Sequence, residues 1–253
     1  MLAFVEEEGR RVLGFRGVAD RAVVVSSVDV YRAFGRLHRT ERGPPDPTPL
    51  TEDSPLRDAV VDEAYDKVAV ERATTSDPGF PVTILRYPAV HGPGDPHRRL
   101  YPYVRRMDDG RPAILLEDGH ARWRWTRGYA EDVGHALALA VESEAGAGRI
   151  YNVAAPVAYA QEEWVRMIAD VVGWRGRVVA VPSEVMPEAL RLGVDFTQHY
   201  DVDSSRIRAE LGYAEVVGER TALGRTVVWE RENPPAEIQL DYLAEDAALA
   251  ALG

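Results

Sequence analysis

The sequence predicts an α/β protein built on a doubly wound parallel sheet, and two observations lead to this class. Unbroken apolar runs occur within RAVVVSS (21–27), PVTILRYP (81–88) and GRIYNVAA (148–155), as is typical of strands buried on both faces of a sheet. Apolar residues recur at three- and four-residue steps over 58–74 and 130–144, which predicts helices between these strands. In such a fold the ligand site lies at the carboxyl ends of the strands.

The other elements follow in chain order. Residues 1–16 have the pattern of an amphipathic helix, and residues 40–55 contain five prolines, which predicts a loop. The chain then predicts a turn-rich loop at 91–99, a short helix at 100–110, extended segments at 113–118 and 122–129, helices at 161–172, 184–191, 203–211 and 219–232, and a strand at 177–181. The acidic, alanine-rich residues at the end are expected to form an appendage.

Composition argues against several classes of function. The 253 residues carry a net charge of −11, which repels a phosphate backbone, so no nucleic-acid partner is expected. There is no cysteine, and the six histidines do not fall at HxH or HxxxH spacing, so we expect neither thiol catalysis nor a metal site. No apolar stretch reaches the roughly 18 residues of a membrane span, and the first residues do not resemble a signal peptide. We expect a cytoplasmic protein with a small-molecule substrate and no membrane partner.

The basic residues single out one position. Of 30 basic residues, Lys67 is the only lysine. Arginine replaces lysine on most solvated surfaces, but not where a compact ammonium group with an adjustable pKa is required. Lys67 is therefore a candidate functional residue, the alternative being a surface lysine without a role.

Five motifs occur in an informative order. They are SSVDVY (26–31), KVAVE (67–71), LRYPAVHGP (85–93), GYAEDVGHALALAV (128–141) and RIYNVAA (149–155). Together they resemble the extended short-chain dehydrogenase/reductase superfamily, in particular its NAD-dependent epimerase/dehydratase group. The resemblance covers about residues 10–232.

The resemblance implies an incomplete doubly wound, Rossmann-like sheet with a smaller C-terminal α+β substrate domain. Residues 1–88 and 128–158 would form a partial dinucleotide-binding domain. Residues 89–127 and 159–235 would form the substrate-binding region, and residues 236–253 a C-terminal tail.

The resemblance also implies catalytic roles. Ser27 falls on the family's catalytic Ser/Thr position, where its hydroxyl would bond the substrate oxygen. Lys67 falls on the family lysine, which holds the nicotinamide ribose and lowers the pKa of a catalytic tyrosine. That tyrosine normally stands four residues before the lysine, where this chain has Glu63.

Several residues could replace the missing tyrosine. Tyr65 is the leading candidate, although two residues of regular helix would turn it about 200° away from Lys67 unless the first turn is irregular. A packing role on the other helix face is the alternative for Tyr65. Tyr31 and Tyr87 are substitutes, and Glu63 could act as a base only with a raised pKa.

The resemblance implies NAD or NADP as the cofactor, with Lys67, Tyr87, Pro88 and Val90 around the nicotinamide. However, the sequence contains no GxxGxxG turn, whose backbone amides hold the pyrophosphate. Either the reading frame starts at an internal methionine or the chain is a natural remnant. We therefore expect this chain alone to bind NAD weakly.

Substrate-binding candidates follow the second strand. His91 replaces the motif's tyrosine and is a candidate, with a solvated loop residue as the alternative, while Ala89 weakens the case for a nucleotide sugar. Arg124 and Arg127 could pair with an anionic substrate group, unless they are solvated. Only one of the two carboxylates of a 4,6-dehydratase is present, Asp29 beside Val28, which disfavours dehydration.

These observations lead to one principal hypothesis and one alternative. The first is an N-terminally truncated NAD(P)-dependent oxidoreductase or epimerase that acts on a secondary alcohol or ketone of a small, possibly sugar-like substrate. The second is a non-catalytic binding or regulatory protein that retains the fold. The resemblance also allows a homodimer formed through parts of 1–16 and 58–74.

Overall fold

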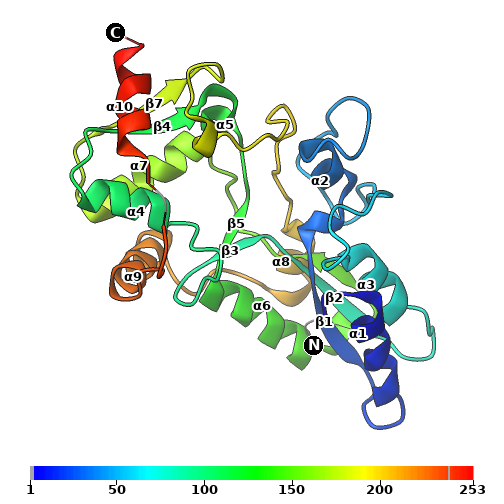
Figure 1. The fold of residues 1–253 in the computed structure, drawn as a ribbon. Helices are drawn as coiled ribbons and strands as arrows, with labels where there is room; N and C mark the ends of the chain where they lie inside the picture. Colours follow the sequence, from blue (N-terminus) through cyan, green and yellow to red (C-terminus); the bar gives the residue numbers. More distant parts are fainter. Residues whose placement is uncertain (1–2, 239, 253) are drawn as a thin grey trace.

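The computed structural model describes residues 3–238 and 240–252, which form two connected lobes (Figure 1). The first lobe contains the central sheet, with strands β1 (Ala22–Ser27), β2 (Val82–Tyr87) and β6 (Ile150–Asn152) and helices α1 (Glu6–Arg10), α2 (Arg32–Leu37), α3 (Lys67–Thr74), α6 (Ala130–Glu142) and α8 (Ser205–Leu211). The second lobe contains β4 (Ala113–Glu117), β7 (Arg177–Val181), α4 (Tyr101–Asp108), α5 (Asp118–Arg122), α7 (Gln161–Val172), α9 (Glu219–Glu232) and α10 (Tyr242–Ala250). Two short strands, β3 (Ala89–His91) and β5 (Arg127–Tyr129), run between the lobes.

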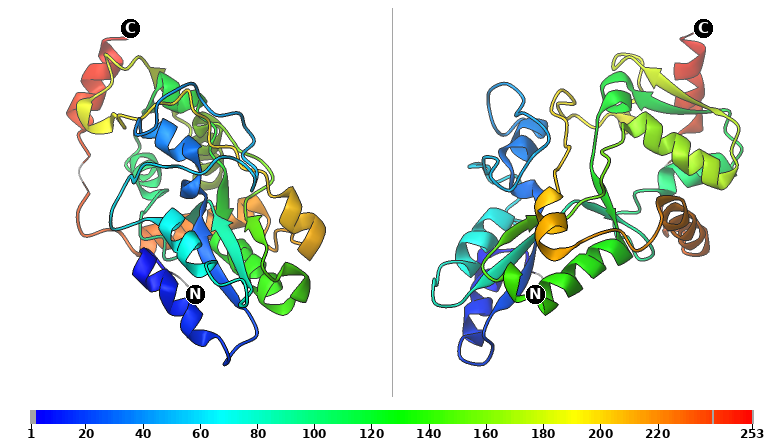
Figure 2. Two further views of the ribbon diagram at one scale, coloured as in Figure 1. Left: turned by 90° about the vertical axis from the view of Figure 1, so that its right-hand side faces the viewer. Right: turned by 180° about the vertical axis from the view of Figure 1, so that it is seen from behind.

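The central sheet is parallel and has the order β1-β2-β6. Ser27 is paired with Tyr87 and Arg86 with Asn152, so all three strands end at one edge. Helices α1 and α3 cover one face, where Val24, Val70 and Ile84 share a core, and α6 covers the other (Figure 2). This arrangement confirms the predicted α/β class with a parallel sheet and places the ends of the motif strands together.

The second lobe is organised around the parallel pair of β4 and β7. Helices α4, α7 and α9 pack on one another, and their apolar side chains form a core with Ile114 and Leu116 of β4. The parallel pair of β3 and β5 connects this lobe with the sheet. No helix of the described residues is long and apolar enough to cross a bilayer.

Four predictions of individual elements differ from the structure. The helix predicted for 58–74 begins only at Lys67, and the helix predicted for 184–191 is a single 3-10 turn, Glu188–Leu190. A short helix, α5, which the pattern did not indicate, joins the two segments predicted to be extended at 113–118 and 122–129 and includes Asp118 and Arg122. The end of the chain is docked rather than free, because α10 buries Glu245 against Arg106 of α4 with a 2.6 Å ion pair.

Candidate functional site

A cavity lies where the carboxyl ends of β1 and β2 meet the loop after β3. Its volume is about 280 Å³. The lining comes from the end of β1, the residue Tyr65 before α3, the β2–β3 segment and the glycine-rich loop after it, and includes Ser26, Ser27, Tyr65, Tyr87, Pro88, Val90, His91, Gly92, Gly94, Asp95 and Arg99. This is the edge of the sheet at which a doubly wound fold binds its ligand.

The structure brings Ser27 and Tyr65 together in this cavity. Both side chains line the cavity, and the neighbouring Ser27 and Asp29 side chains act on the pKa of the Tyr65 phenol. Burial raises the pKa of Tyr65 to about 12, so the phenol keeps its proton at neutral pH. Burial also raises the pKa of Asp29. A hydroxyl, a phenol and a carboxyl group therefore form one polar cluster at the carboxyl end of β1.

Tyr65 reaches this polar cluster because it precedes α3 instead of lying on it. Asp66 is the N-cap of α3, and its side chain accepts hydrogen bonds from the amides of Val68 and Ala69. The same carboxylate pairs with Arg57 at 3.0 Å, and the Asp66 amide donates to the carbonyl of Phe4 at 2.9 Å. These contacts make Lys67 the first residue of α3. The rotation of about 200° expected between Tyr65 and Lys67 on a regular helix therefore does not apply.

Lys67 lies behind the cavity rather than in it. Its side chain is 2% exposed, and its amine donates to the carbonyl of Ala3. The Nζ atom is 4.5 Å from the centre of the Phe4 ring and 5.1 Å from that of Tyr65. Burial lowers the pKa of Lys67 to about 8. Lys67 is thus next to the proposed acid/base tyrosine, but residues 3 and 4 hold its amine away from the cavity lining.

A buried polar network supports the site from behind, and its roles were not predicted from the sequence. Arg86 donates to both carboxylate oxygens of Glu71 at 3.0 and 2.8 Å, and Ser26 donates to Glu71 at 2.7 Å. Arg86 also donates to the hydroxyl of Tyr31, which in turn donates to Asn152. Burial raises the pKa of Tyr31 to about 12. The Tyr31 hydroxyl is therefore already engaged by this network. The signal that could have indicated the network is the presence of Glu71 in the KVAVE motif and of Arg86 in the LRYP motif.

The remaining cofactor-site candidates line the cavity. Tyr87, Pro88 and Val90 all face it, and the Tyr87 hydroxyl donates to the carbonyl of Val133 at 2.6 Å, which fixes the ring. Burial raises the pKa of Tyr87. A phenol engaged in this way is held as a wall of the cavity and is a poor substitute for Tyr65 as the acid/base.

His91 is buried between two cavities, so the alternative of a solvated loop residue is wrong. It lies on β3 with 5% exposure, and its ring packs edge-on against Trp164 at 5.2 Å between centroids. Its Nδ1 is 3.3 Å from the hydroxyl of Thr226. Burial lowers the pKa of His91 to about 3, so the ring is neutral at physiological pH.

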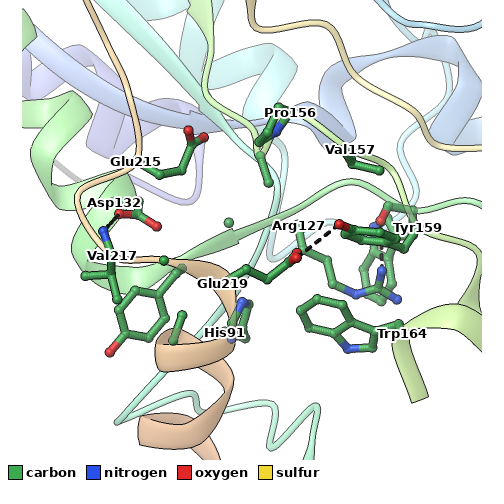
Figure 3. A pocket seen from close by; sticks show the side chains of 16 residues that line it. His91, Arg127, Asp132, Pro156, Val157, Tyr159, Trp164, Glu215, Val217 and Glu219 are labelled. Carbon is green, nitrogen blue, oxygen red and sulfur yellow. Dashed lines mark hydrogen bonds between the residues drawn. The ribbon is translucent and has the colours of Figure 1, made fainter. Parts of the chain in front are cut away.

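A second cavity of about 250 Å³ adjoins His91 on the side of the second lobe (Figure 3). Arg127 lines it between the rings of Trp125 and Trp164, at 5.0 and 4.5 Å from their centres. Its guanidinium donates to the Trp125 carbonyl and to the side chain of Gln161, and no carboxylate of the described residues forms an ion pair with it. Burial lowers the pKa of Arg127 to about 9, which leaves it charged at neutral pH.

Arg124 differs from Arg127 in its position. It is exposed, donates to the carbonyl of Ala158 at 2.9 Å and lies 3.7 Å from Glu163. Strand alternation explains the difference, because residues of an extended segment point to opposite sides according to their spacing. Arg124 therefore does not line either of these cavities, and its predicted substrate role is not supported by its position.

Sequence reasoning missed two polar residues at the second cavity. Glu219 lies at the start of α9 and accepts a hydrogen bond of 3.0 Å from Tyr159, and Figure 3 shows this pair beside Arg127. Burial raises the pKa of Glu219. Because these residues come from different elements far from the motifs, no local pattern could have joined them.

Comparison with known proteins agrees with the fold and the motifs. Residues 12–154 match the model of the NAD dependent epimerase/dehydratase family. The chain is 30% identical over 178 residues to a 2'-dehydrokanamycin reductase from Streptomyces kanamyceticus and 29% identical over 187 residues to a dTDP-glucose 4,6-dehydratase from Streptomyces griseus. These matches cover 68% and 71% of this chain but 47% and 52% of the relatives. The chain thus spans about half the length of the curated relatives it matches.

The solved structures give the same result. A dTDP-glucose 4,6-dehydratase from Streptomyces venezuelae, determined with NAD bound, matches with a TM-score of 0.64 and 27% identity, over 90% of this chain and 67% of that one. The match of a family model to more than half of the chain confirms the resemblance drawn from the motifs. The chain belongs to the NAD dependent epimerase/dehydratase family of the extended short-chain dehydrogenase/reductase superfamily.

Proposed function

We propose that this chain carries the catalytic site of an NAD(P)-dependent oxidoreductase or epimerase that acts on a secondary alcohol or ketone of a sugar-like substrate. The observation that carries this proposal is that Ser27 and Tyr65 line the same cavity, at the carboxyl ends of β1 and β2. The relatives, a reductase of an aminoglycoside and dehydratases of dTDP-glucose, support a substrate of this class.

The lining of this cavity fits the nicotinamide end of the cofactor. Pro88 and Val90 supply apolar walls, Gly92 and Gly94 leave room beside them, and the hydroxyls of Ser27 and Tyr65 lie on the same cavity. A bound nicotinamide supplies or accepts the hydride. The pyrophosphate of the cofactor has no corresponding site in this sequence, because the GxxGxxG turn whose amides would hold it is not present.

The chain's own residues account for the proton in this proposal. The Ser27 hydroxyl bonds the substrate oxygen and orients it toward the phenol. Tyr65, whose pKa is raised to about 12, is protonated at neutral pH and donates its proton to the oxygen of a carbonyl as it becomes an alcohol. The neighbouring carboxyl group of Asp29 raises the pKa of the phenol further, which helps it to keep its proton. In the reverse direction the phenol must lose its proton, which the nearby ammonium group of Lys67 favours.

Arg127 provides a means of binding an anionic part of the substrate. Its guanidinium faces the second cavity without an ion-pair partner among the described residues, and the cavity adjoins the first at His91. A guanidinium fork binds phosphate or carboxylate oxygens with two parallel hydrogen bonds. We therefore place the reacting carbon of the substrate near Tyr65 and its anionic group near Arg127.

The test compares two tyrosine variants. Wild-type protein, Tyr65→Phe and Tyr242→Phe are incubated with NAD(H) or NADP(H) and dTDP-glucose, UDP-glucuronic acid or a 2'-dehydro aminoglycoside, and products are followed by mass spectrometry. Tyr65→Phe is expected to abolish turnover. Tyr242→Phe removes a phenol hydroxyl from α10, where it donates to Asp109, and this variant is expected to retain turnover. Undiminished turnover by Tyr65→Phe would remove this residue from the mechanism.

A non-catalytic binding protein is a second candidate, and one observation favours it. The Lys67 amine is bound to the Ala3 carbonyl and does not line the cavity. If this arrangement persists with ligand, the chain binds a sugar-like anion through Arg127 without hydride transfer. Binding of dTDP measured by calorimetry, without turnover on any substrate above and without a change on Tyr65→Phe, would support this candidate.

A further inference from the structure

A third cavity, separate from the two above, lies between α2 with the loop that follows it and the segment around residue 195, which neighbours α2 in Figure 1. Its volume is about 230 Å³. Three arginines line it, Arg36, Arg39 and Arg42, together with the carboxylates of Glu41 and Asp195. The two segments are joined by a backbone hydrogen bond of 2.7 Å from the amide of Asp195 to the carbonyl of Leu37. None of these residues belongs to the motifs or to the proposed catalytic site.

The guanidinium of Arg36 is buried in part and lacks acceptors. Its Nε and Nη1 atoms are inaccessible to solvent and have no hydrogen-bond partner among the residues that the structure describes. The guanidinium lies against the backbone of Gly43, where a Cβ atom would be only 2.8 Å from Nη1 and Nη2. Gly43 also has a φ of 121°, which L side chains rarely adopt. The loop is thus shaped around a cation whose donors need a partner.

The carboxylates of the cavity are already engaged elsewhere. Glu41 accepts hydrogen bonds from the amides of Asp58 and Ala59 at 2.7 and 3.0 Å. Asp195 accepts bonds from the amide and hydroxyl of Thr197 at 3.0 and 2.6 Å. Three guanidinium groups and two engaged carboxylates leave an excess of positive charge, on a chain whose net charge is −11.

We propose that this cavity binds a phosphate-type oxyanion, either inorganic phosphate or the phosphate group of a larger molecule. Such an anion offers several acceptors at once, which suits three guanidinium groups that line one cavity, those of Arg36, Arg39 and Arg42, the last two of which are exposed. Bound there, it connects α2, which follows the loop of Ser27, with the segment around residue 195. The site goes beyond the proposed function and shares no residue with it.

Calorimetric titration with inorganic phosphate, pyrophosphate and adenosine 5'-monophosphate, at constant ionic strength in chloride, tests this proposal. We expect one saturable site in Arg127→Met, which removes the cation of the second cavity, and this site together with any binding at Arg127 in wild-type protein. Arg36→Gln is expected to weaken binding at least tenfold. Arg42→Gln, an exposed change that spares the fold, is expected to weaken it severalfold. Arg105→Gln, an exposed arginine paired with Asp109, is the matched control and is expected to bind as wild type does.

The outcomes are distinct. Binding of inorganic phosphate that is as tight as that of the nucleotide identifies the free ion as sufficient, whereas binding of the nucleotide alone identifies a phosphate carried by a larger molecule. Binding that disappears in Arg127→Met but persists in Arg36→Gln and Arg42→Gln would overturn the proposal, as would the absence of saturable binding of all three probes to wild-type protein. Each result is independent of turnover, so failure of the proposed enzymatic function leaves this test intact.

Discussion

Replacing Lys67 with methionine is expected to remove a pH dependence of stability that arises from burial of its ammonium group. The side chain is 2% exposed, and burial lowers its pKa from 10.5 to about 8. Between these values the unfolded chain holds the proton more tightly than the folded protein, so the free energy of unfolding rises with pH. Well below pH 8 the buried amine is charged, and the full cost of its burial lowers the free energy of unfolding of the wild-type protein. The gain for wild type relative to Lys67→Met is about 1.4 kcal/mol by pH 9 and about 2.5 kcal/mol by pH 10.

Urea denaturation, followed by tryptophan fluorescence at pH 7, 8, 9 and 10, measures this difference. Lys67 is the only lysine, and its neighbour Tyr65, whose pKa is raised to about 12, stays protonated in the folded protein up to pH 10, so the difference between the two curves isolates this amine. Arg72→Met, an exposed change on the same helix, is the control and is expected to give a difference that does not vary with pH. A flat difference for Lys67→Met from pH 7 to 10 would contradict the desolvation of the amine and the description of this side of the site.

Three further predictions concern the support of the site. Glu71→Gln leaves the buried Arg86 without its ion pair, so urea denaturation should show a loss of about 3–5 kcal/mol, and an effect below about 1 kcal/mol would show that the pair is not needed. Asp66→Ala removes both the N-cap of α3 and the ion-pair partner of the buried Arg57, so it should cost more than the roughly 1 kcal/mol of a cap alone in the same assay, whereas Asp62→Ala should cost less. Arg127→Met should weaken dTDP binding at least tenfold by calorimetry, and equal affinity for Arg124→Met and Arg127→Met would refute the placement of the anion in the second cavity.

The sequence predicted the parts of the fold that local chemistry determines. The apolar runs that became β1, β2 and β6 are buried on both faces in β2 and in part in β1 and β6, and their pairing brings Ser27, Tyr87 and Asn152 to one edge. The start of α3 could not be predicted from periodicity, because Val60, Val61 and Ala64 continue the helical spacing. It depends on the contacts of Asp66 with Arg57, which tertiary structure supplies.

The candidate site divides in the same way. Ser27 was named from its motif position and Tyr65 as the tyrosine nearest to Lys67, and both line the same cavity. The orientation of the Lys67 amine depends on Ala3 and Phe4, which are distant in sequence, and no motif describes that contact. Arg124 and Arg127 were equivalent as sequence candidates. Their odd spacing on an extended segment places them on opposite sides, and packing against Trp164 buries Arg127 while Arg124 stays exposed.

The departure from YxxxK spacing has a geometric explanation. Four residues of α-helix advance about 6 Å, which brings a tyrosine on the preceding turn beside the lysine. Two residues of non-helical chain can span up to about 7 Å. Since α3 begins at Lys67 and Tyr65 precedes it, a tyrosine two positions away lines the same cavity as Ser27 without lying on the helix. Inserting two residues between Tyr65 and Asp66 would lengthen this span without restoring the helical turn. The two-residue spacing of Tyr65 and Lys67 therefore requires that α3 begin only at Lys67, as the contacts of Asp66 impose.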